Sequence, residues 1–259
     1  MRTAAQINIA NFFLIYALLL IVLCIMKKCK IQQSKLLLLG SIRMTIQLML
    51  AGFVLMYIFE HDHPIFTFLY IVVMVGFAIH RVLSRNPQLN KRFKIIIALS
   101  LACSGLGVVI FFITCIIQEN LWDPQYAIPL SGMIFGNVMT GLNLGLKTFS
   151  ESLKANTKQV EALLNFGARP QAIMQPFVAQ ALETALLPTL NSMIGMGIVS
   201  LPGMMTGQIL SGTLPTTAIL YQIAIMIAIC TVVCLSVFGS LYFGYRSLYN
   251  KENQITSMD

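Results

Sequence analysis

Charge is what this chain has least of. Only 10% of its 259 residues are Asp, Glu, Lys or Arg, whereas about 25% of the residues in a soluble domain are charged. Hydrophobic residues make up 57% of the chain, and the mean hydropathy is +0.80. Water therefore cannot be the main solvent of this protein, which excludes the ordinary soluble fold classes.

Catalytic and cofactor motifs are also missing. No His, Cys and Asp residues have zinc-site spacing, and no Gly-x-Ser-x-Gly elbow occurs. The stretch from Gly141 to Thr148 approaches a phosphate-binding loop, but Leu146 stands where glycine is required. We therefore expect no enzyme, no bound cofactor and no recognisable metal-ligand set. If ATP drives this protein, a separate partner chain must bind ATP with Mg and hydrolyse it.

Long apolar stretches are what the sequence has instead. A transmembrane helix needs roughly 20 mostly apolar residues, whereas barrel strands are about 9 to 11 residues with alternating polarity. The pattern predicts an all-α, polytopic membrane protein with about seven transmembrane helices. The predicted spans are Ile7–Met26, Leu36–Phe59, Phe66–Ile79, Phe93–Ile117, Ile128–Leu146, Leu182–Leu201 and Ile219–Tyr245.

The basic residues are distributed unevenly along the chain. The net charge is +8, and with the N-terminus outside, all 17 Lys and Arg except Arg2 and Arg43 fall on the cytoplasmic side or in the tail. This asymmetry is the positive-inside pattern, so the charge indicates orientation in lipid rather than nucleic-acid binding. It predicts a multi-pass membrane protein with a cytoplasmic C-terminus. The opposite side holds Glu60, Asp62, Glu119 and Asp123.

Most loops are short, which predicts one membrane domain over residues 1–259, and the exception is the segment 148–181. Its apolar residues recur at roughly helical spacing up to Gly167, which can end a helix in a left-handed conformation. Pro170 can open the next helix, because its missing N–H costs nothing there. We expect a cytoplasmic helix-turn-helix, which is either an amphipathic element lying on lipid or a docking element for another protein.

The fifth predicted span carries two pairs of small residues. Gly132 with Gly136, and Gly141 with Gly145, start nine residues apart, so the pairs face opposite ways at roughly 100° per residue. Such a helix can be approached closely on both sides. We expect it inside the bundle.

Polar side chains within the spans are few, and they are candidates for a translocation pathway. Each also has a structural alternative: Arg43 can snorkel to the interface, and the amides can join helices together. The charge-free segment 200–215 is either a re-entrant turn or a tight external loop. The pathway candidates are Arg43, Gln47, Asn137, Asn143, Glu183, Asn191, Gln208 and Gln222.

Several stretches together resemble the FetB-type membrane subunits of ABC transporters, a family described as bacterial iron exporters with plant relatives linked to aluminium tolerance. The similar stretches keep one order over most of the chain, and SLPGMM is the most specific phrase. They are RMTIQLMLAGFVL at 43–55, IPLSGMIFGNVM at 128–139, EALLNFGARPQA at 161–172, LLPTLNS at 186–192 and GIVSLPGMMTGQILSG at 197–212.

The resemblance implies a function for the segment 148–181. In type I ABC importers a cytoplasmic Glu-Ala-Ala loop followed by glycine inserts into a cleft of the ATPase subunit. EALLNFG is similar, because Glu161, Ala162 and Gly167 match, although Leu163 replaces the second alanine and Leu187-Pro188 lies farther on. An ATPase would then dock on residues 150–172. Glu161 would pair with a base, and Leu163, Leu164 and Phe166 would fill the groove.

The resemblance implies a permease subunit for iron export in the bacterial inner (plasma) cell membrane, working as a homodimer with two ATPase subunits. Other cargo stays open, because the spans hold no dense carboxylate cage. The alternatives are an ABC permease for another metal or a small organic solute, a stand-alone secondary carrier or channel, and a membrane scaffold that moves nothing.

Overall fold

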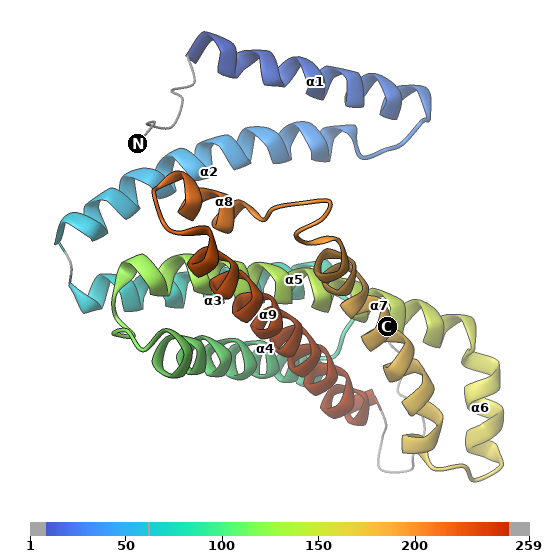
Figure 1. Cartoon of the computed structure of the whole chain (residues 1–259). Coiled ribbons are helices and arrows are strands. Elements are labelled where there is room, and N and C mark those ends of the chain that lie inside the picture. The colour runs from blue at the N-terminus through green and yellow to red at the C-terminus, as the bar shows by residue number, and fades with distance from the viewer. Residues whose placement is uncertain (1–8, 62, 249–259) are drawn as a thin grey trace. The chain divides into compact units, whose positions relative to one another are not determined.

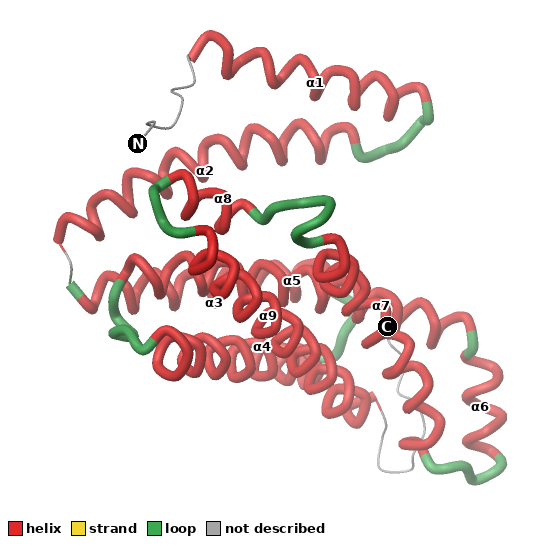
Figure 2. Tube along the Cα trace, in the orientation of Figure 1, coloured by secondary structure: helices red, strands yellow, loops and turns green. Residues whose placement is uncertain are grey.

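The described residues of the computed structural model are 9–61 and 63–248, and nearly all of them are helical (Figures 1 and 2). Within these ranges the only β feature is an isolated bridge between Met196 and Ser200. The predicted all-α fold is therefore confirmed. The elements are α1 (Ile9–Lys28), α2 (Ser34–His61), α3 (Pro64–Arg85), α4 (Lys91–Phe111), a π-helix (Phe112–Ile117), α5 (Pro124–Ala155), α6 (Thr157–Asn165), α7 (Pro170–Gly195), α8 (Gly203–Leu210), α9 (Pro215–Gly244) and a 3-10 turn (Tyr245–Leu248).

Five helical segments in the described ranges are long and apolar enough to cross a membrane. The predicted number of about seven is not confirmed, because α1 and α7 are not among them, and the orientation of the termini stays a prediction. The sixth predicted span was misplaced. Its helix, α7, begins at Pro170 and ends at Gly195, before Gly197 with a φ of +84°. The five spans are Ser34–His61, Pro64–Arg85, Lys91–Ile117, Pro124–Ala155 and Pro215–Ser247.

The chain divides into two compact units, which we describe separately. The first contains α1 and α2, an antiparallel helix pair (Figure 1) in which the hydroxyl groups of Tyr16 and Thr45 share a hydrogen bond. The second contains the helices from α3 onward, apart from residues 210–212, which cluster with the first unit. The prediction of one membrane domain is not tested by this division.

Helix α5 forms the centre of the second unit. It contacts α3, α4, α7 and α9, and its side chains at Leu130, Ile134, Val138 and Leu142 are buried. Because a helix buried around most of its circumference must be apolar on several faces, this position agrees with the long uncharged stretch that begins α5. The prediction that this helix lies inside the bundle is confirmed.

Close helix approach explains the glycines of α5. A Cβ atom at Gly141 would lie 2.6 Å from Cγ1 of Val233 in α9, and one at Gly145 would lie 2.9 Å from Cγ1 of Val237. Gly132 faces α3, where the added Cβ would lie 3.1 Å from the Met74 methyl, but Gly136 has nothing within 4 Å. The two glycine pairs therefore face different neighbours, and only the second pair is fully packed.

We expect Gly141→Ala to lower the free energy of unfolding of the purified protein in detergent. The added methyl overpacks the contact with Val233, at a cost of about 1 to 3 kcal/mol. The matched variant Gly107→Ala, in α4, places the same methyl in open space and gains up to about 1 kcal/mol of helix propensity. Chemical unfolding followed by circular dichroism measures both. Equal destabilisation by the two variants would contradict this packing.

Candidate functional site

The segment 148–181, called the α6 hairpin below, contains the end of α5, all of α6 and the start of α7. Asn156 is the joint between α5 and α6, with a φ of −111° and a ψ of 18°. Its side-chain amide donates to the Ser152 carbonyl at 2.8 Å, and its backbone N–H donates to the Ser152 and Leu153 carbonyls. Asparagine suits such a position because its side chain satisfies backbone groups that a helix end leaves open.

The apolar face of α6 packs against its own protein. Val160 is 1% exposed, and Leu164 is half-buried against the hydrophobic core that includes Leu153. An amphipathic helix that lies on lipid would instead present this face to the acyl chains. The geometry therefore favours the docking alternative over the lipid-surface alternative.

Helix α6 ends in a glycine turn with two characteristic hydrogen bonds. The Ala168 N–H donates to the Leu163 carbonyl at 3.0 Å, and the Gly167 N–H donates to the Leu164 carbonyl at 2.9 Å. This pair of bonds, with Gly167 at a φ of +80°, defines a Schellman motif. Pro170 then occupies the first turn of α7. Both sequence predictions for this turn are confirmed.

The outward side of the hairpin carries most of the predicted docking residues. Phe166 is 88% exposed and Leu163 is 38% exposed, while Glu161 and Ala162 are also exposed. Among the described residues, Glu161 has no salt-bridge partner, unlike Glu151, which pairs with Lys147 at 3.8 Å. Leu164 differs from the other predicted docking residues, because it is turned toward the core.

The predicted pathway residues are spread over several helices. In the first unit, Arg43 and Gln47 are exposed on α2. In the second unit Asn137, Glu183 and Asn191 are exposed, Asn143 and Gln208 are half-buried, and Gln222 is buried.

The side-chain amides of Asn137, Asn143 and Gln222, on α5 and α9, differ in their hydrogen bonds. The Asn137 side-chain amide donates to the Met133 carbonyl at 2.8 Å, within its own helix. By contrast, the side-chain carbonyl oxygens of Asn143 and Gln222 are buried and have no hydrogen-bond partner among the described residues. An unsatisfied buried acceptor is costly, so these two oxygens are candidates for contact with a ligand.

Asn143 and Glu183 lie at one level of the α5–α7 pair. The position of Gly145 faces the Ala181 carbonyl and the Ala185 side chain, and Gly141 faces the Ala185 carbonyl. Asn143 lies midway between these glycines, and Glu183 lies midway between these alanines. Each of the two residues lies about 200° around its helix from the positions that face the other helix, so their side chains do not point into the α5–α7 contact. Both carry oxygen ligands of the kind that hard and borderline metal ions prefer. Among the described residues, no group of three or more His, Cys, Asp or Glu can hold a metal.

Sequence reasoning did not single out the end of α9. Gln171 donates to the Tyr242 hydroxyl at 3.1 Å, which ties the start of α7 to α9. Tyr242 also stacks on Phe238, with ring centroids 5.0 Å apart. The spacing Phe238, Tyr242, Tyr245 (i, i+4, i+7) was the available signal, since it places three aromatic residues on one helical face.

The long apolar helices and the close contacts at the α5 glycines identify the chain as a helical membrane protein. Its residues 9–249 match the sequence model described as "Uncharacterised protein family (UPF0014)", and the chain belongs to this family. No solved structure matches it.

Curated relatives cover most of the chain. It is 35% identical over 217 residues to the UPF0014 membrane protein slr1647 of Synechocystis, covering 82% of this chain and 83% of the relative. It is 32% identical over 251 residues to the probable iron export permease protein FetB of Escherichia coli, covering 96% and 95%. It is 31% identical over 216 residues to the protein ALUMINUM SENSITIVE 3 of Arabidopsis thaliana, covering 82% and 77%. The resemblance to the FetB-type family is confirmed.

We expect Gly167→Ala to weaken the turn without unfolding the protein. A Cβ at a φ of +80° costs about 1 to 2 kcal/mol, so hydrogen exchange at the Gly167 and Ala168 amides should accelerate about 5- to 30-fold. Gly167→Asn is the control, because asparagine tolerates this conformation better. Exchange followed by mass spectrometry measures both, and unchanged protection in the alanine variant would contradict the motif.

Proposed function

We propose that the chain is the membrane-spanning permease subunit of an ABC transporter for iron export. It works as a homodimer, and each copy is energised by a separate ATPase subunit that docks on residues 150–172. ATP and Mg belong to that partner, and the α6 hairpin lies on the cytoplasmic side of the cell membrane. The similarity to a probable iron export permease supports this assignment.

One observation carries the docking part of the proposal: Phe166 is 88% exposed at the end of α6, although α6 buries its own apolar face. A large aromatic side chain held out by a rigid turn is the kind of anchor that fills a partner's pocket. Glu161 lies about one turn earlier on the same short helix, and its carboxylate, which has no salt-bridge partner in residues 9–61 and 63–248, can pair with a basic residue of the ATPase. Phe166, Leu163 and Glu161 thus form the contact, while Leu164 fixes the helix to its core.

The cargo part of the proposal depends on Asn143 and Glu183. One copy offers these two side chains at a single level of α5 and α7, and a second copy doubles them, so four oxygen-bearing groups can meet iron. If the chain is instead an ABC permease for another metal or a small organic solute, the same ATPase docking is expected with a different cargo.

We expect Phe166→Ala to weaken binding of the ABC ATPase by roughly 30-fold. This corresponds to the loss of a hot-spot anchor worth about 2 kcal/mol. Stimulation of ATP hydrolysis by the permease should fall in parallel. Surface plasmon resonance with an ABC ATPase from the same organism measures the affinity, and phosphate release measures the stimulation.

The matched control is Phe243→Ala, which removes another exposed phenylalanine, 52% exposed and located in α9. It should leave ATPase binding unchanged. If the Phe166→Ala variant bound the ATPase with wild-type affinity and stimulated ATP hydrolysis normally, the docking assignment would be wrong for any cargo.

For the cargo, we expect Glu183→Gln to lower iron transport into inverted vesicles by about tenfold or more, since even outer-sphere partners of a metal contribute that much. ATPase binding should persist, because Glu183 lies outside the proposed contact. Glu119→Gln, in an exposed loop, is the control and should transport normally. Normal iron transport by the Glu183→Gln variant would show that Glu183 is not part of the pathway.

A further inference from the structure

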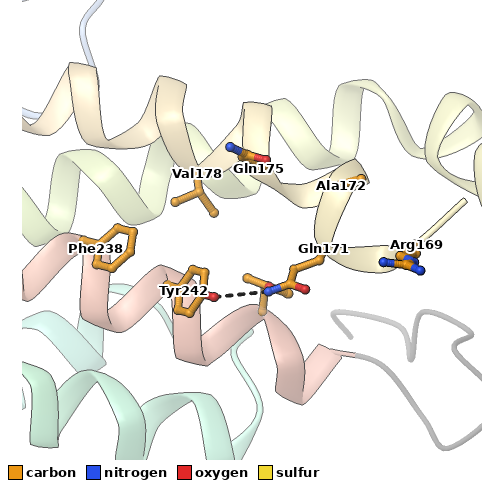
Figure 3. Close-up of a pocket in the computed structure, with 8 residues that line it drawn as sticks. Arg169, Gln171, Ala172, Gln175, Val178, Phe238 and Tyr242 are labelled. Carbon is orange, nitrogen blue, oxygen red and sulfur yellow. Dashed lines mark hydrogen bonds between the residues drawn. The ribbon is translucent and has the colours of Figure 1, made fainter.

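A pocket of about 530 Å³ lies between the start of α7 and the end of α9, inside the second unit (Figure 3). Its lining includes Arg169, Gln171 and Val178 from the α7 side, and Phe238, Tyr242 and Tyr245 from the α9 side. Arg169, Gln171 and Ala172 fall within residues 150–172, but the residues of the proposed docking contact, Phe166, Leu163 and Glu161, do not line the pocket. The cargo residues Asn143 and Glu183 do not line it either.

One end of the pocket is rich in donors. Arg169 is an exposed cation at the N-cap of α7, and Arg246 lies with its guanidinium carbon 5.2 Å from the Tyr242 ring centroid. The N–H groups of Ala172 and Ile173 both donate to the Arg169 carbonyl. The described residues offer no acceptor to the Gln171 N–H. A free N–H at a helix N-terminus, beside the N-cap cation Arg169, attracts an anion.

Tyr245 supplies a second and independent observation. It lines the pocket, it is 4% exposed, and its hydroxyl has no hydrogen-bond partner among the described residues. The Arg246 side chain lies within weak hydrogen-bonding range of the Tyr245 and Tyr242 hydroxyls, but the Tyr245 oxygen makes no hydrogen bond of ordinary geometry. A buried hydroxyl without a partner is unfavourable, and a ligand oxygen in the pocket would satisfy it.

The other end of the pocket is apolar. Helices α7 and α9 are antiparallel, because Gly141 and Gly145 meet Ala185 and Ala181 in α7 but Val233 and Val237 in α9. Val178 and Phe238 therefore both lie deeper along the helices than Arg169 and Tyr245 do. Figure 3 shows Phe238 and Val178 together at one side and Arg169 at the other. Such a gradient matches an amphiphile with an anionic head and a hydrocarbon tail.

We propose that this pocket binds the phosphate group of an anionic phospholipid. The phosphate accepts hydrogen bonds from Arg169, from the Gln171 N–H and from the Tyr245 hydroxyl, and Arg246 adds positive charge at the rim. The acyl chain lies along Val178 and Phe238. The span that contains α9 ends at Ser247, which brings this end of the pocket to the headgroup region.

The test titrates the purified full chain in detergent with phosphatidylglycerol, phosphatidylcholine and soluble glycerol 3-phosphate, and native mass spectrometry follows the bound species. We expect phosphatidylglycerol to bind about tenfold more tightly than phosphatidylcholine, since the latter has a neutral headgroup. Arg169→Gln should weaken phosphatidylglycerol binding by about tenfold, the effect of losing one charge-assisted hydrogen bond. The matched control, Arg92→Gln, removes an exposed arginine in the first turn of α4 and should bind normally.

Tyr245→Phe separates a ligand contact from a structural role. Removing an unpartnered buried hydroxyl should leave the lipid-free protein as stable as the wild type or more stable, yet it should weaken phosphatidylglycerol binding several-fold. Tyr70→Phe, in α3, is its control. Unchanged phosphatidylglycerol affinity in either the Arg169 or the Tyr245 variant would overturn the proposal. Equally tight binding of glycerol 3-phosphate would overturn the lipid assignment and indicate a soluble phosphate ester.

Discussion

Close packing of α5 against α7 and α9 at Gly141 and Gly145 is the constraint on which the second unit depends. In lipid, apolar side chains gain little by leaving the hydrocarbon, so helices associate through tight van der Waals contact between small residues. The same device recurs at the end of α9, where a Cβ atom at Gly244 would lie 2.6 Å from the Phe93 ring of α4. The hydroxyls of Ser104 and Ser236 add a hydrogen bond between α4 and α9.

The packed helices α5 and α7 connect the α6 hairpin directly to the glycine contacts. Helix α5 is continuous from the buried glycines to Ala155, and α7 is continuous from Pro170 past the level of Glu183. A force applied at Phe166 therefore reaches the glycine contacts through two helices rather than through flexible loops. Packed helices shift between discrete arrangements rather than deform continuously. Under the proposed docking, a push on the hairpin would therefore switch the arrangement of these helices.

The sequence was most informative where local chemistry decides the conformation. The φ of Gly167 and the helix start at Pro170 follow from rules about single residues, and the central place of α5 follows from its glycines and from the lack of charge before Lys147. It was least informative where tertiary packing decides. Leu163 and Leu164 are neighbours of identical chemistry, yet the structure exposes the first and half-buries the second. The end of α7 at Gly195 instead of Leu201 follows a local turn, in which the Val199 and Ser200 N–H groups donate to the Gly195 carbonyl. The pocket beside Tyr245 depends on contacts between segments far apart in the chain.

The exposed face of α5 bears on the stoichiometry that we propose. Gly136 has open space around it, and Asn137 and Thr140 beside it bond only to their own helix, through the carbonyls of Met133 and Gly136. A polar strip with a glycine is poorly suited to lipid, since it offers little apolar area and keeps amide atoms in hydrocarbon. A second copy that lays the same strip against this one would exclude lipid from these polar atoms. It would also bring two sets of Asn143 and Glu183 toward one path, which gives a chain with few ligands a site with enough of them.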